Sequence, residues 1–109
     1  MTLERMISLF GDDRVVMGEI CSLFLQEVRQ TTAQLEAALE SGDMKAAKKA
    51  AHTIKGSAGN VGADEVAALA LDIEKVILAN DADGALILLP ALQDAVEDTA
   101  AFLHAELGI

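Results

Sequence analysis

Apolar residues recur at intervals of three and four along almost the whole chain, and this spacing is the strongest constraint on its fold. Such intervals place side chains on one face of an α-helix, whereas a half-buried β-strand shows strict alternation. No alternating run rich in β-branched residues is present. The pattern therefore predicts an all-α protein. Its helices are expected over about residues 3–10, 13–40, 43–60 and 63–79, with a last helical region marked by an apolar stripe over residues 92–107.

Short clusters of Gly, Asn, Asp and Ser separate these periodic segments. Glycine and asparagine tolerate the left-handed backbone just past a helix end, and aspartate accepts the first free N–H groups of the next helix. Pro90 lies inside the last helical region and removes a backbone donor, which predicts a kink or a separate short turn over about residues 83–89. The clusters are at residues 11–13, 41–43, 61–64 and 80–83, and the one at 61–64 is the weakest.

The short connections between the long segments favour antiparallel neighbours. We therefore expect a single domain over residues 1–109, folded as an up-down-up-down four-helix bundle with an additional short N-terminal helix packed across it. The composition is 52% apolar with only three aromatic residues, all phenylalanine, so the core must be built mainly from aliphatic side chains and alanine. One apolar stripe on each helix fits a monomer.

The formal net charge of −10 argues against nucleic acid as a partner, because phosphate backbones are bound by clustered Lys and Arg. The longest apolar run, residues 85–92, is too short to span a bilayer. No signal-like apolar segment follows Met1, and the one cysteine, Cys21, excludes an internal disulfide and fits a reducing compartment. We expect a soluble cytoplasmic protein that does not bind membranes.

The basic residues are unevenly distributed, and His52 lies in the middle of them. The window 44–63 contains no Asp or Glu, although the chain carries eighteen, and four of its eight Lys and Arg lie within eleven residues. At about 100° per residue, His52 is rotated out of the apolar stripe of its helix. Its surface neighbours, three, four or seven positions away, are Lys48, Lys49, Lys55, Gly56 and Gly59.

This arrangement has a chemical interpretation and a structural one. A neutral imidazole is a nucleophile, and a phosphoryl group on it would add negative charge that Lys55 could meet one turn away. Gly56 and Gly59 each cost about 1 kcal/mol of helix stability against Ala, and they leave room for a phosphoryl group and a partner's backbone. On the structural interpretation, His52 is an ordinary surface residue, the lysines form a solvated face and the glycines permit close helix packing.

The segment from Ala51 to Ala63, AHTIKGSAGNVGA, resembles the signature of histidine-phosphotransfer (HPt) domains. That signature has histidine, any residue, an aliphatic residue, Lys, Gly and a small pair, followed by a short spacer to aliphatic-Gly-Ala. The resemblance covers nearly the whole chain. The surrounding pattern agrees at Phe24 and Leu35 before the segment, at residues 41–43, and at Leu71, Ile73 and Glu74 after it.

The resemblance implies a helical-bundle fold and assigns roles to four residues. His52 would be the phosphorylated residue, Lys55 would help to hold the phosphoryl group, and Gly56 would give access, to which the position of Gly59 on the same face adds. Ser57 would take the small position after Gly56 and help locally by hydrogen bonding. No cofactor or metal bound by this chain is implied, and Mg²⁺ is expected on a partner receiver domain.

Four other residues are weaker candidates. Lys48 and Lys49 match no fixed position of the signature, and we treat them as local electrostatics only. Cys21 is expected to be a buried apolar residue, and His104, near the end of the last helix, a structural or solvated one. Two histidines are too few for a convincing metal site.

The resemblance implies a phosphorelay carrier rather than an enzyme. His52 would accept a phosphoryl group from the phospho-aspartate of a response-regulator receiver or hybrid histidine kinase, and would pass it to another receiver aspartate. No ATP-binding motif is present, so autophosphorylation is not expected. Two alternatives stay open: the phospho-accepting module of a chemotaxis-type or hybrid histidine kinase, and a helical adaptor that is never phosphorylated.

Overall fold

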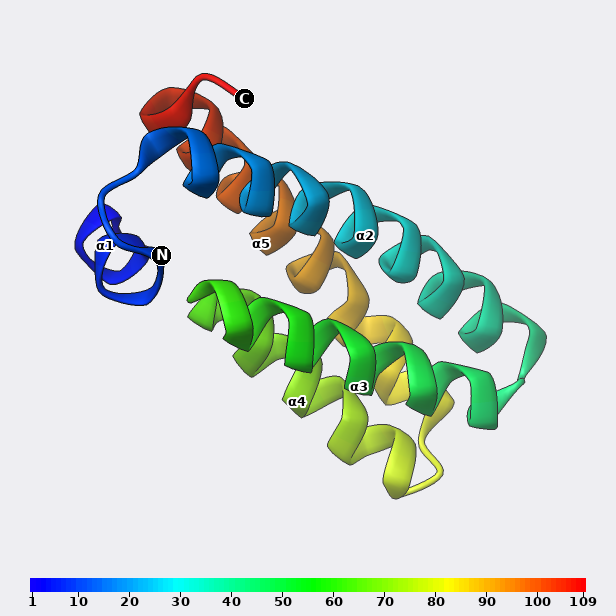
Figure 1. Ribbon diagram of the computed structural model, residues 1–109. Coiled ribbons are helices and arrows are strands. Elements are labelled where there is room, and N and C mark those ends of the chain that lie inside the picture. Colours follow the sequence, from blue (N-terminus) through cyan, green and yellow to red (C-terminus); the bar gives the residue numbers. More distant parts are fainter.

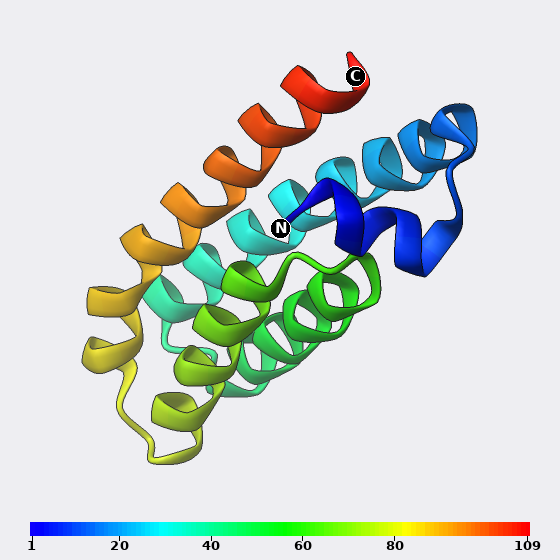
Figure 2. The same ribbon diagram turned by 90° about the vertical axis from the view of Figure 1, so that its left-hand side faces the viewer.

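The computed structural model describes residues 1–109 and contains five α-helices joined by short turns (Figure 1). Their bounds are α1 (Leu3–Phe10), α2 (Arg14–Ser41), α3 (Met44–Val61), α4 (Asp64–Leu78) and α5 (Ala82–Leu107). Helices α2 and α4 each pack against both α3 and α5, and the chain reverses direction at every turn between them (Figures 1 and 2). The predicted up-down-up-down bundle with a short extra N-terminal helix is confirmed.

Aspartate side chains begin three of the four long helices. Asp13, Asp43 and Asp81 accept hydrogen bonds from backbone N–H groups in the first turns of α2, α3 and α5. Helix α4 differs, because its N-cap residue is Ala63 and no side chain caps it. The prediction that an aspartate caps this helix is wrong: Asp64 is already the first helical residue, where its charge meets the positive end of the helix dipole.

A residue with left-handed backbone angles follows each of the helices α2, α3 and α4. Gly42 follows α2 with φ 78° and Gly62 follows α3 with φ 75°, while Asn80 takes φ 59° after α4. Gly62 is also covered by α1, since a Cβ atom there would lie 2.8 Å from Cγ of Arg5. The turn after α3 is therefore both tight and packed beneath the N-terminal helix.

Helix α5 runs without interruption through Pro90. The alternative of a separate short turn over residues 83–89 is wrong. Proline removes the hydrogen bond that its position would donate to the carbonyl of Leu86. Burial of side chains on both sides of Pro90 offsets this lost hydrogen bond. The buried residues are Ala85 and Leu89 before Pro90 and Leu92 after it. None of the five helices combines the length and the apolar character that a membrane crossing requires.

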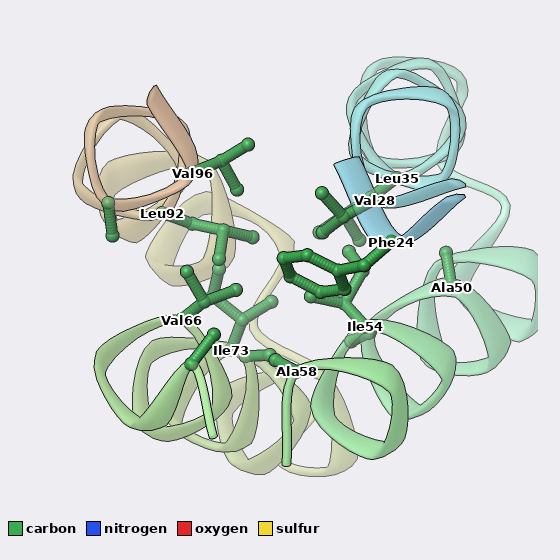
Figure 3. Close-up of a cluster of buried hydrophobic side chains, with 14 of the residues drawn as sticks. Phe24, Val28, Leu35, Ala50, Ile54, Ala58, Val66, Ile73, Leu92 and Val96 are labelled. Carbon is green, nitrogen blue, oxygen red and sulfur yellow. The ribbon is translucent and has the colours of Figure 1, made fainter. Parts of the chain in front are cut away.

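A core of 26 buried apolar residues draws on all five helices. Phe24 is its only buried aromatic side chain, and aliphatic residues and alanines fill the rest. Helix α1 contributes Met6, which is fully buried, whereas Ile7 is 40% exposed although its spacing places it on the same apolar face. Figure 3 labels ten core residues: Phe24, Val28, Leu35, Ala50, Ile54, Ala58, Val66, Ile73, Leu92 and Val96.

Candidate functional site

His52 projects from the outer face of α3. Ala51 and Ile54 on the same helix are fully buried in the core, whereas 70% of the His52 side chain is exposed. The expected rotation of His52 out of the apolar stripe is confirmed. A reactive group in this position can be reached by a partner without opening the bundle.

A carboxylate from the neighbouring helix α4 holds the His52 ring. Oε2 of Glu74 lies 3.0 Å from Nδ1 of His52, and Oε1 of Glu74 accepts a hydrogen bond of 2.9 Å from Nζ of Lys55. The Glu74 side chain is only 11% exposed, against 32% for Lys55. One carboxylate therefore links the histidine and the lysine and fixes both relative to α4.

The charge of Glu74 decides which nitrogen of His52 is free. The hydrogen bond from Lys55, aided by that with His52, lowers the pKa of Glu74 and outweighs the opposing effect of burial. Glu74 is therefore ionised near neutral pH, and a carboxylate can only accept hydrogen bonds. Nδ1 of His52 must then be the donor. In a neutral imidazole this leaves Nε2 without a proton, so its lone pair is available as a nucleophile.

Glu74 agrees with the HPt pattern, but the sequence alone assigns it no role. The spacing of apolar residues around Glu74 nevertheless indicates a role, because it places this charge on an apolar helix face. Glu74 lies on the buried face of α4 with Ala70, Ile73 and Ile77, and it is the only charged side chain among the buried residues. A charge on an apolar face needs a partner, because an unpaired buried charge is costly. Only the structure shows that its partners are Lys55 and His52.

We expect the Glu74→Gln variant to be less stable than the wild type by about 1 kcal/mol near neutral pH, and to lose this disadvantage in acid. The pKa of Glu74 is lowered in the folded state. Its carboxylate therefore stabilises the fold above the pKa of a free glutamate, and this contribution disappears as the pH falls through the folded-state pKa. Urea midpoints of both proteins should converge between about pH 6 and pH 3. A constant difference across this range would contradict an ionised Glu74.

Gly56 and Gly59 occupy exposed positions on the same face of α3 as His52. A Cβ atom built on either residue would meet nothing within 4 Å. Close packing between helices therefore does not account for glycine at these positions. The open surface beside His52 agrees with the predicted role in access.

Three other predicted residues lie outside the contact between His52, Lys55 and Glu74. Lys48 and Lys49 are exposed and form no salt bridge, and their role as local electrostatics stays a prediction. Ser57 is half-buried and lines a small cavity between α2 and α3, together with Glu27 and Asn60. It is turned about 140° around the helix from His52, so its supporting role stays a prediction without a direct contact.

The remaining candidates, Cys21 and His104, lie in the surroundings of structural residues. Cys21 is fully buried, and burial raises the pKa of its thiol, which disfavours the reactive thiolate. Nδ1 of His104 lies 2.8 Å from the carbonyl oxygen of Ile109, at the exposed end of α5. No group of three or more His, Cys, Asp and Glu side chains is placed to hold a metal ion.

Comparison with protein families identifies the chain. The model described as "Hpt domain" matches residues 19–102, a segment that contains His52, Lys55, Gly56 and Glu74. The chain belongs to the Hpt family. The match begins within α2 and leaves out α1. Comparisons with curated proteins and with solved structures find no match. The matched segment is a phosphotransfer module rather than a kinase, and it implies histidine phosphotransfer in a phosphorelay.

Proposed function

We propose that His52 accepts a phosphoryl group from the phospho-aspartate of a receiver domain and passes it to the aspartate of another receiver. The observation that carries this proposal is the contact of 3.0 Å between Nδ1 of His52 and the ionised Glu74. It orients a largely exposed ring and leaves Nε2 as the nucleophile. No side-chain carboxylate holds His104, the other histidine, whose Nδ1 faces the main-chain oxygen of Ile109.

For this transfer the chain supplies a nucleophile, Nε2 of His52, and a negative charge, that of Glu74. The lone pair of Nε2 forms a bond to phosphorus while the bond between phosphorus and the aspartyl oxygen breaks, and aspartate leaves as a carboxylate. Nδ1 keeps its proton, so positive charge develops on the ring, and Glu74 stabilises this charge as the aspartate of a catalytic triad does. Mg²⁺ held by the receiver would neutralise the charge on the transferring oxygens. Transfer to a second receiver is the reverse of these steps.

Lys55 and the two glycines support the phosphorylated state. Lys55 lies one turn from His52, and its Nζ is already held on the same side by Glu74 at 2.9 Å. A phosphoryl group on Nε2 brings acceptor oxygens that the ammonium can bind in addition to Glu74 or in its place. Gly56 and Gly59 leave the surface around that group free of side chains.

Incubation with a purified, phosphorylated receiver domain, in the absence of kinase and ATP, tests the proposal. We expect label to appear on this protein and to be held through a P–N bond, which is lost in mild acid and survives mild base. Measuring the label that remains after each treatment identifies the linkage. Label that survives acid would point to a hydroxyl such as that of Ser57. A protein that binds the receiver but never takes up label would be an adaptor.

A further inference from the structure

The exposed face of α3 has two halves with different chemistry, and His52 lies between them. At about 100° per residue, three lysines N-terminal to His52 project within about 60° of its direction, and two glycines C-terminal to it project within about 40°. The basic half consists of Lys45, Lys48 and Lys49, and the bare half of Gly56 and Gly59.

The lysines of the basic half have no acidic partner within the chain. All three are exposed, and none takes part in a salt bridge, although the protein carries eighteen acidic residues. Lys55, the other lysine of α3, differs because it is paired with Glu74. A protein of net charge −10 thus keeps a run of unpaired positive charge beside its reactive histidine.

We propose that the basic half is a docking surface for acidic side chains of the receiver domain, and that the bare half accepts the receiver's backbone, so that the receiver binds along α3 in one orientation. This inference rests on the proposed function. A receiver that holds Mg²⁺ beside its phospho-aspartate must supply oxygen ligands, above all carboxylates. The face that it presents to His52 is therefore acidic and complements Lys45, Lys48 and Lys49.

The physical effect of this complementarity is on encounter and orientation. Opposite charges raise the association rate and disfavour wrong orientations, and both effects weaken as salt screens the charges. Without the lysines, the net negative charge of this protein would repel an acidic receiver face. The basic half overcomes that repulsion only near His52, where productive contact is needed.

The test measures the dissociation constant of the unphosphorylated receiver by isothermal titration calorimetry, at low and at high salt. The variants are Lys48→Gln, Lys49→Gln and the double substitution. A matched control is Ala101→Glu, which lowers the net charge by the same amount as each single variant. Ala101 is exposed on α5, and α5 lies diagonally across the bundle from α3.

At low salt we expect the dissociation constant to rise about threefold for each single variant and about tenfold for the double variant, and to converge with the wild type at high salt. The control should bind as the wild type does. Equal binding by all the proteins, or an equal loss in the control, would overturn the docking surface. Label uptake by the wild type is a separate measurement, so failure of phosphotransfer remains distinguishable from failure of docking.

Discussion

The His52→Gln variant is expected to take up no phosphoryl label from a phosphorylated receiver, while it remains folded. Glutamine lacks the imidazole lone pair, but its amide can still donate a hydrogen bond to Glu74. The side chain of His52 is 70% exposed, so its replacement leaves the core untouched. Acid-labile label should fall to background, at least about a thousandfold below the wild type. Far-ultraviolet circular dichroism of the variant should match that of the wild type.

His104→Gln provides the matched control for this result. His104 is also exposed, but its Nδ1 faces the main-chain oxygen of Ile109, and no Asp, Glu or Lys side chain is paired with it. The variant should therefore take up label at the wild-type rate. Equal labelling of the His52 variant and the wild type would mean that another residue accepts the phosphoryl group.

Substitution of Gly56 should separate stability from transfer. Gly56→Ala is expected to be more stable than the wild type by about 0.5–1 kcal/mol, because glycine inside a helix is unfavourable and an added Cβ would meet nothing within 4 Å. Transfer should nevertheless be slower. Gly56→Gln should remain folded and transfer about a hundredfold more slowly, because its side chain keeps the receiver from close approach to His52. The measurements are the urea midpoint and the rate of label uptake for each variant.

Ala101→Gln is the control for the added side chain. It places glutamine on an exposed position of α5, away from α3, and it should transfer as the wild type does. If Gly56→Ala were instead less stable while its transfer per folded molecule stayed unchanged, Gly56 would serve the packing of the helix rather than access to His52.

The helices, most of their ends and the exposure of His52 followed from the sequence because the forces behind them are local. Periodic burial and aspartate caps act within one or two turns, so the spacing alone places His52 outside the apolar stripe. Local signals were insufficient at Pro90 and at Asp64. The helix continues through Pro90 because packing on either side of it outweighs one lost hydrogen bond. Asp64 lies one position inside α4, where its charge meets the positive end of the helix dipole instead of capping a free N–H group.

The sequence by itself indicated the family, and it placed His52 and the two glycines on one exposed face of a helix, because that placement depends on the helix alone. Only the tertiary structure decided that Glu74 holds Nδ1 of His52 and pairs with Lys55. Glu74 and His52 lie on different helices, 22 positions apart. Their contact depends on how far α4 is rotated against α3, and the packing of the whole core sets that rotation. The same packing turns Ser57 toward α2 and leaves the surface over Gly56 open.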